Sequence, residues 1–542
     1  MCGINGFNLR DEALVKLMNE RTRHRGPDGT GVFVENGISL GHNRLAIIDL
    51  SDAASQPMAD QSGRFVIVFN GEIYNYRELK QELEASYQFR TASDTEVILA
   101  AYARWGGKCV TRFNGIFAFA LWDKETRELI LARDHMGVKP LYYYWDGKRF
   151  IFSSEIKAIL EHDVPRALNR EALQHYLRVL YVPAPLTMFA GITKLPPAHT
   201  ARLKTGKFSV ERYWEIPSVS VRTEEWTDTL TEARDVIGAA VRRQLVSDRP
   251  LGVYLSGGID SSIVLAEMAT AHKKIDTFSV GFDLTEAEQR EKFNADFDLA
   301  RLTARHFGAN HHEVLLASDD VAENFEQMVW HLDEPISNPT NLAMQKIAKF
   351  ARESVTVVLS GDGGDELFGG YERYRLSCLA TSYQRIPLIV RGWPNFISPF
   401  RDLNTPRGIE RFMRFLFQKD DVVSRVLAAD FFDRDRSMQF FERRFFSAKR
   451  DISPEEELMR VDQQSWLVDE ALERADKMSM AHAIEQRVPL LDKEVVEFAA
   501  GIPTNCKVTP FRTKILLKDA YRGHIPDILL RQPKRGWFAP GA

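Results

Sequence analysis

Two apolar runs in the second half of the chain each end in a turn that begins with Ser-Gly. Leu251–Leu255 runs into Ser256-Gly257-Gly258-Ile259-Asp260-Ser261-Ser262, and Val355–Leu359 runs into Ser360-Gly361-Asp362-Gly363-Gly364-Asp365. A third run lies at Asp276–Gly281, and helical stretches separate the three, which favours a parallel sheet covered on both faces. The carboxyl ends of parallel strands meet at one edge, where open α/β sheets bind ligands. Both turns are therefore expected at a ligand site.

The first part of the chain, to about Trp214, has a different texture. Its short β-type runs are Gly31–Val34, Phe65–Phe69, Gly115–Leu121, Leu129–Leu131 and Leu141–Tyr144. A few helical stretches, such as Asp11–Glu20 and Thr95–Trp105, lie between them. This pattern predicts an α+β domain built on antiparallel sheets. Because prolines crowd the chain before a break near Ile216–Thr223, the sequence predicts two domains of unlike construction, the second mostly helical after about Tyr371.

Composition excludes several classes of protein. The 542 residues hold 71 Lys+Arg against 75 Asp+Glu, a net charge of −4, which argues against a nucleic-acid binder. No apolar run approaches the ~20 residues of a membrane-spanning helix, and the start of the chain lacks the pattern of a signal peptide. The four cysteines are too scattered for a disulfide framework or a zinc site. We therefore expect a cytoplasmic enzyme with no membrane partner.

Cys2 directly follows Met1. If Met1 is removed, one residue carries both a thiol and an α-amino group, and that amine, with a pKa near about 8, can accept the thiol proton. An inert early cysteine is the plainer interpretation of Cys2 alone.

Four further residues could complete an acyl-transfer site for an amino acid. Arg44 can hold a carboxylate in a bidentate contact, and Asp94 can accept an ammonium group. Asn70 and Gly71, after a strand, can donate to an oxyanion. Taken singly, they are equally well explained as a solvated charge, a helix cap and a turn.

Together with Arg23–Gly29, Asp134–Tyr142 and Phe152–Glu155, these segments resemble the class II glutamine amidotransferase domain, which has an N-terminal nucleophile hydrolase fold. The resemblance implies a glutaminase domain at residues 2–212, with stacked antiparallel sheets between helices. Cys2 is then the nucleophile, and Asn70 and Gly71 are the oxyanion donors. The implied glutamine-binding residues are Arg44, Leu45, Ala46, Ile47, Ile48, Asn70, Gly71, Glu72 and Asp94.

The turn at Ser256–Ser262 suits a pyrophosphate group. Its two glycines let backbone amides approach a phosphate, and the helix expected after it adds positive potential. Asp260 could hold a magnesium ion, as could acids of the second turn. The segment lacks the Gly-Lys-Ser/Thr of a Walker A loop. A Ser/Gly turn with a helix cap remains the simple alternative.

The two turns resemble the ATP-pyrophosphatase domain of the asparagine synthetase family, over residues 226–542. The resemblance implies ATP-binding residues, namely Leu255, Ser256, Gly257, Gly258, Asp260, Ser261, Ser262, Val280, Ser360 and Gly361. It also implies Asp260 and Asp365 as ligands of Mg²⁺. Asp362 stands where many members carry Glu, a residue of the acyl-adenylate step. Lys514 matches a lysine that stabilises charge there, or is a solvated helix lysine.

The two resemblances together imply an enzyme with glutamine, ATP and an acceptor carboxylate as substrates. Glutamine hydrolysis would supply ammonia, and ATP would convert the carboxylate to an acyl-adenylate that ammonia attacks. L-aspartate is the expected acceptor, with a sugar uronate, a peptide carboxylate or a β-lactam precursor as alternatives. A non-catalytic glutamine or nucleotide sensor is the rival of another class.

Several points stay open at the level of sequence. Asp333 and Glu334 belong to a segment, Trp330–Pro335, that matches the family without an assigned role. The chain ends at Ala542, where relatives are expected to continue with another helical stretch. A homodimer is one of the assemblies open to the chain, since a symmetric interface leaves no reliable mark in one sequence.

Overall fold

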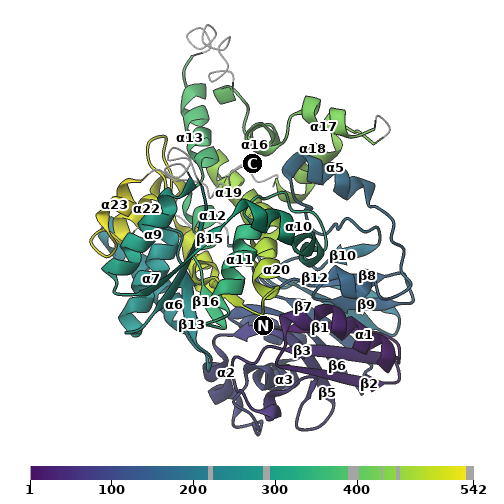
Figure 1. Ribbon diagram of the computed structural model, residues 1–542. Coiled ribbons are helices and arrows are strands. Elements are labelled where there is room, and N and C mark those ends of the chain that lie inside the picture. Colours follow the sequence, from purple (N-terminus) through teal and green to yellow (C-terminus); the bar gives the residue numbers. More distant parts are fainter. Residues whose placement is uncertain are drawn as a thin grey trace.

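The computed structural model describes residues 2–217, 224–284, 293–387, 402–428, 431–446 and 452–532. The described chain forms two halves that lie side by side (Figure 1). The first half, purple to blue, contains two antiparallel sheets, and the second, teal to yellow, surrounds a parallel sheet.

Each antiparallel sheet of the first half has six strands. In spatial order the first sheet contains β10 (Ile192–Lys194), β8 (Tyr142–Trp145), β9 (Phe150–Ser153), β1 (Gly3–Phe7), β3 (Ile38–Arg44) and β2 (Gly29–Glu35). The second sheet contains β12 (Lys207–Arg212), β11 (His199–Lys204), β7 (Glu128–Arg133), β6 (Gly115–Asp123), β5 (Phe65–Ile73) and β4 (Met58–Ala59). The five β-type runs predicted for this half coincide with these strands, except that Leu141 directly precedes β8.

The two antiparallel sheets pack face to face. Ile4 and Leu40 of the first sheet share a buried cluster with Val68, Ala120 and Leu131 of the second. Alternate side chains of each strand point outward and pack under helices. These helices are α1 (Glu12–Thr22) and α4 (Ile156–Ile159) on the first sheet, and α2 (Tyr76–Leu83) and α3 (Asp94–Trp105) on the second. The predicted α+β class, with stacked sheets between helices, is confirmed.

The sheet of the second half is parallel throughout, as its three apolar runs predicted. Its order is β15 (Asn310–Leu316), β14 (Asp276–Phe282), β13 (Leu251–Tyr254), β16 (Val357–Leu359) and β17 (Glu485–Arg487). One face is covered by α6 (Trp226–Gln244), α7 (Ile259–Ala271) and α9 (Ala295–His306). The other is covered by α10 (Ser318–Leu332), α11 (Asn341–Ala351) and α20 (Glu473–Met480).

The remainder of the second half is mostly helical, as predicted. Its helical elements are α12 (Gly364–Phe368), α13 (Glu372–Gln384), α16 (Ile409–Leu416), α17 (Asp420–Val426), α18 (Arg436–Phe445), α19 (Pro454–Gln464), a π-helical turn (Leu467–Leu472), α21 (Lys493–Gly501), α22 (Ile515–Ala520) and α23 (Asp527–Arg531). Helix α5 (Arg170–Val179) of the first half packs against α18. Within the ranges described, no helix has the length and apolar character needed to cross a bilayer.

Buried ion pairs join the two halves. Arg25 donates to Asp476 at 2.8 Å and to Glu155 at 3.0 Å, and none of the three side chains is more than 2 % exposed. Asp333 binds Lys157 at 2.9 Å, and Glu334 binds Lys194 at 2.7 Å. The segment Trp330–Pro335, to which the sequence assigned no role, therefore holds the first half against the second.

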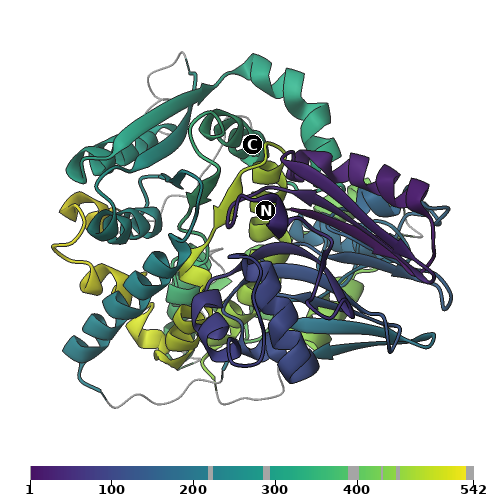
Figure 2. The ribbon, with the colours of Figure 1, turned by 90° about the horizontal axis from the view of Figure 1, so that it is seen from below.

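Apolar contacts reinforce this boundary. Leu45 and Ile47 of the first half lie in one buried cluster with Val253, Leu255 and Leu359 of the parallel sheet. The N-terminal end of the chain is close to the same boundary, as the two views agree (Figures 1 and 2).

Candidate active sites in the two halves

The first candidate site begins at Cys2, at the edge of β1. Its backbone nitrogen donates to Asn70 Oδ1 at 2.9 Å, and its Sγ lies 3.9 Å from the carbonyl oxygen of Leu45. Arg25 Nε donates to the Cys2 carbonyl at 3.1 Å. Burial raises the pKa of the thiol above its usual range, so the cysteine needs a nearby base to become a thiolate.

Asn70 and Gly71 follow each other on β5, beside Cys2. The Asn70 side chain is fully buried, and among the described residues its Nδ2 has no hydrogen-bond partner. A buried amide donor without a partner is costly unless a ligand satisfies it. Gly71 has φ +148°, and a Cβ there would lie 2.0 Å from the carbonyl oxygen of Ile116. This position on β5 can therefore hold only glycine without rearrangement.

Two buried acids lie next to this site. Asp94 is in the first turn of α3, which Ser93 caps, and its Oδ2 accepts from the backbone nitrogen of Ile73 at 2.9 Å. Burial raises the pKa of Asp94 to about 6. Burial and the charge of Asp94 also raise the pKa of Glu72 well above its usual range. Arg487 of β17 lies 3.6 Å from Glu72 and 2.6 Å from Glu485.

The segment Arg44–Ile48 joins the first site to the second half. Leu45, Ala46 and Ile47 are buried, and the Ile47 carbonyl accepts from the backbone nitrogen of Asp248 at 2.9 Å. The Arg44 guanidinium donates to the carbonyl of Ser51 at 2.8 Å. In this conformation the expected carboxylate clamp is thus engaged with its own loop.

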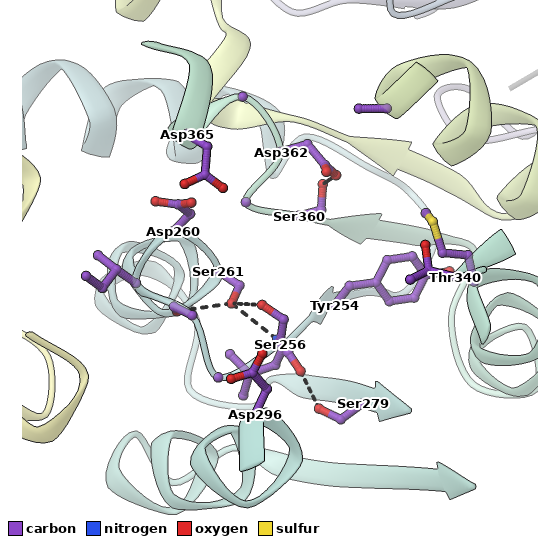
Figure 3. Close-up of a pocket in the computed structure, with 18 of the residues that line it drawn as sticks. Tyr254, Ser256, Asp260, Ser261, Ser279, Asp296, Thr340, Ser360, Asp362 and Asp365 are labelled. Atoms are coloured by element: carbon purple, nitrogen blue, oxygen red, sulfur yellow. Dashed lines mark hydrogen bonds between the residues drawn. The ribbon is translucent and has the colours of Figure 1, made fainter. Parts of the chain in front are cut away.

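The second candidate site is a cavity of about 500 Å³ at the carboxyl ends of β13, β14 and β16. Nine of the ten residues expected to bind ATP line it, namely Leu255, Ser256, Gly257, Gly258, Asp260, Ser261, Val280, Ser360 and Gly361. The tenth, Ser262, is fully buried within α7, where its hydroxyl donates to the Gly258 carbonyl at 2.7 Å. Figure 3 shows Ser256 and Ser261 bonded to each other on one wall of the cavity.

Lys514 lies between the two expected metal ligands. Its ammonium group contacts Asp260 and, at 2.6 Å, Asp365 Oδ1. The carboxylates of Asp260 and Asp365 lie next to each other and point toward one another (Figure 3). All three side chains are buried or nearly so. Lys514 is therefore no solvated lysine: its charge balances the two acids.

The cavity also contains polar residues that sequence reasoning missed. They are Asn338, Glu366, Tyr371, Glu470, Arg474 and Gln486. Tyr371 donates to Glu366 at 2.6 Å, and burial raises the pKa of Glu366 to about 8. Arg474 binds Glu470 at 2.8 Å, and Glu470 accepts from Asn338 at 2.7 Å. Glu366 and Tyr371 adjoin the second glycine turn, and Gln486 belongs to a segment, Glu485–Asp492, that resembles the family without an assigned role. Asn338, Glu470 and Arg474 come from distant segments without a local signal.

Asp260 and Asp365 are the carboxylates expected to hold a divalent cation, and both line this cavity. No group of three or more His, Cys, Asp or Glu side chains with metal-binding geometry occurs in the part of the chain that the structure describes. Two carboxylates suffice for Mg²⁺ when substrate phosphates and water supply the remaining ligands. Asp260 and Asp365 are of the right kind and face each other, so they fit a nucleotide-bound Mg²⁺.

Comparison with known proteins gives a consistent result along the whole chain. The family model of the glutamine amidotransferase domain matches residues 1–214, and that of asparagine synthase matches residues 232–541. The chain is 33% identical to asparagine synthetase [glutamine-hydrolyzing] 1 of Bacillus subtilis (strain 168), over 100% of this chain and 87% of that protein.

Two further relatives are similar over nearly the full length. A putative asparagine synthetase [glutamine-hydrolyzing] of Mycobacterium tuberculosis (strain ATCC 25618 / H37Rv) is 32% identical over 96% of this chain and 82% of its own. Amidase chry2 of Gibberella zeae is 27% identical, over 95% of this chain and 83% of its own.

Proposed function

The chain belongs to the family of glutamine-hydrolysing asparagine synthetases, and from that premise we propose that it converts L-aspartate to L-asparagine through an acyl-adenylate. The observation that carries the proposal is the presence of two complete constellations in one chain. Cys2 lies against Asn70, and Lys514 joins Asp260 and Asp365 in a cavity at the strand ends. One supports the release of ammonia, and the other supports activation of a carboxylate.

In the first half, Cys2 would act as the N-terminal nucleophile after loss of Met1. Its backbone nitrogen, bonded to Asn70 Oδ1, would then be an amine that takes the thiol proton. The thiolate attacks the side-chain amide of glutamine, and ammonia leaves as a thioester forms. Water then hydrolyses the thioester to glutamate.

The surroundings of Cys2 support this chemistry. Asn70 Nδ2 and the backbone of Gly71 would stabilise the oxyanion; one such donor is typically worth about 10²–10³ in kcat. Ionised Asp94 would hold the substrate ammonium. Arg44 would hold the substrate carboxylate once it leaves its loop partners. Leu45, Ala46, Ile47, Ile48 and Glu72 would complete the walls of the glutamine site.

In the second half, ATP would bind along the two glycine turns. Backbone amides of Ser256–Ser261 and the N-terminus of α7 suit the phosphates, and Leu255, Val280, Ser360 and Gly361 would contact the adenosine part. Asp260 and Asp365 would hold Mg²⁺, which, when bound, neutralises charge on the phosphates. The ammonium group of Lys514, which contacts Asp260 and Asp365, would also stabilise the negative charge that develops on the reacting phosphate.

The acceptor carboxylate attacks the α-phosphorus of ATP and pyrophosphate leaves, which gives an acyl-adenylate. Ammonia then attacks the acyl carbon, AMP departs, and the nitrogen loses a proton. Asp362, at the cavity wall, would act in the step that forms or consumes the acyl-adenylate. Because ammonium cannot attack, ammonia would have to travel between the halves without reaching bulk water.

The test is release of pyrophosphate from ATP and Mg²⁺ with glutamine, across a panel of carboxylic acids, with product mass measured in the same wells. We expect turnover with L-aspartate and formation of asparagine. Mass spectrometry of the intact chain should show that Met1 is absent. Cys2→Ala should lose glutamine-dependent amidation by more than about 10³-fold and keep the ammonium-dependent reaction.

Other results would revise the proposal in distinct ways. Turnover only with a sugar uronate, a peptide carboxylate or a β-lactam precursor would replace the acceptor and keep the mechanism. Absence of pyrophosphate with every acid would contradict it and favour a sensor.

A further inference from the structure

Gln486 is the central residue of β17 and lines the second site from a strand that carries no apolar side chain. Its side chain is 3 % exposed. Nε2 donates to Asp362 Oδ2 at 2.6 Å and to Ser360 Oγ at 2.9 Å, and Oε1 accepts from Ser479 Oγ at 3.1 Å. Both hydrogens of the amide are therefore used at the cavity wall, and its oxygen is anchored in α20.

The hydrogen bonds around Asp362 form a closed arrangement. Ser360 Oγ also donates to Asp362 Oδ2, at 2.6 Å. Both donors thus meet one oxygen and restrain the carboxylate without using Oδ1. Asp362 itself lies in a turn between Gly361 and Gly363, which has φ +91°. A short side chain on such a turn has little packing of its own, so these two donors determine where the carboxylate points.

The pairing of β17 explains why Gln486 can do this. Gln486 lies opposite Val358 of β16 in a parallel ladder, so the two side chains share one face of the sheet. Glu485 and Arg487 necessarily point to the other face, where Arg487 approaches Glu72 of the first site. One three-residue strand therefore touches both sites, with Gln486 alone facing the cavity.

We propose that Gln486 is a positioning residue for the acyl-adenylate step, which orients Asp362 toward the reacting groups. This rests on the function proposed above. Gln486 Nε2 lies 2.6 Å from Asp362 Oδ2, so a side chain longer by one methylene can keep the direction of Asp362 only by displacing Gln486. A longer acid in this direction therefore requires a smaller residue at position 486.

The decisive experiment measures ammonium-dependent amidation in Gln486→Leu, which has a similar volume but no donor. We expect kcat to fall by about 10- to 100-fold, the size of effect that a small misplacement of a reacting group produces. KM for ATP should change less than kcat, since among the proposed adenylate contacts only Ser360 loses a hydrogen-bond partner. Glutamine hydrolysis at Cys2 should also stay within about twofold, because the opposite face of β17 is untouched.

A matched pair of variants separates positioning from simple stability. Asp362→Glu alone should lower kcat, because its extra methylene collides with Gln486. Adding Gln486→Ala to it should raise kcat above that of either single variant. Circular dichroism spectra and melting temperatures of the wild type, Asp362→Glu, Gln486→Ala and the double variant provide the folding control.

Three results would overturn the inference. The first is an unchanged kcat in Gln486→Leu. The second is a parallel loss of glutaminase and synthetase activity, which indicates general damage. The third is additive behaviour of the pair. A wild-type protein that releases no pyrophosphate would overturn both this inference and the proposed function, whereas the first three leave the proposed function intact.

Discussion

At the level of single residues, the Asn70 side chain of the first site serves both as a hydrogen-bond acceptor and as a potential donor. Asn70 accepts from the backbone nitrogen of Cys2 through Oδ1, and its buried Nδ2 has no partner among the described residues. An amide is well suited to this position because it presents an acceptor and a donor in one plane. A carboxylate of the same shape would offer only acceptors, and would repel an oxyanion.

Asp94 gives the first site a pH dependence. Its pKa is raised by burial to about 6, so it loses the charge that would hold the substrate ammonium as the pH falls through 6. The Cys2 amine must also be neutral, with an ordinary pKa near about 8. For the glutaminase, kcat/KM should therefore fall with a slope of one below about pH 8 and a slope of two below about pH 6.

Asp94→Asn removes only the second of these titrations. We expect kcat/KM for glutamine to be lower by at least about 10²-fold at pH 8, since a charge-assisted contact is lost. The acid limb should keep a slope of one down to pH 5. A slope of two that persists in the variant would contradict the assignment of that titration to Asp94.

Local sequence patterns pointed to some residues of the two candidate sites and not to others. The glycine turns and the Cys2 segment carry strong local patterns, and the structure gathers nearly all of their residues into two sites. Arg474 gave no signal, because it enters the cavity from a helix more than a hundred residues beyond the glycine turns, and Gln486 belongs to a segment, Glu485–Asp492, that resembles the family without an assigned role. Only tertiary packing brings such residues to a site.

At the level of elements, strands made of apolar residues were predicted from the sequence, whereas a strand made of charged and polar residues was not. The runs at Phe65–Phe69 and Val355–Leu359 lie in β5 and β16 as expected. β17 consists of Glu-Gln-Arg, yet all three residues are buried. Glu485 and Arg487 pair at 2.6 Å, which offsets part of the cost of burying their charges. Hydrophobic periodicity cannot reveal a strand of that kind.

The close antiparallel pairing of β5 with β6 sets a limit on position 71. A methyl group there would meet the Ile116 carbonyl oxygen at 2.0 Å and Phe117 Cα at 2.6 Å, both parts of the backbone. We expect Gly71→Ala to lower the free energy of unfolding by about 1–3 kcal/mol, and to impair glutamine hydrolysis by displacing Asn70. Denaturant titration and glutamate release measure the two effects.

Gly29→Ala provides the control, since its added Cβ would lie 3.8 Å from Arg44 Cβ, an ordinary contact. Both glycines lie in strands of the first half. Equal loss of stability in the two variants would contradict the steric argument, because Gly→Ala without a clash lowers the entropy of the unfolded chain and should not destabilise the protein.

In the whole molecule, buried ion pairs hold one half against the other. Arg25 contacts the Cys2 carbonyl and, across the boundary, Asp476. Removing its charge leaves Asp476 and Glu155 partly uncompensated, and breaking such a buried pair typically costs about 3–5 kcal/mol. Arg25→Met should therefore be strongly destabilised. It should also form less asparagine for each glutamate released, because the two halves fit less closely.

Arg23→Met is the matched control, two residues away. Arg23 is 71% exposed and lies 3.7 Å from Glu20, so its loss should leave stability and coupling within experimental error. Measuring glutamate and asparagine in the same reaction gives the ratio directly. An Arg25→Met enzyme with wild-type ratio and melting temperature would show that the boundary does not depend on this pair.

The packing of Leu45 and Ile47 into the core of the parallel sheet has a consequence for how such a chain could be divided in evolution. Gene fission between the halves would leave each product with an uncovered apolar patch, which in the first product would lie at the segment Arg44–Ile48. Neither product would be a free-standing enzyme. A split form of this protein could persist only as a permanent heterodimer, whose two genes would have to be expressed in equal amounts.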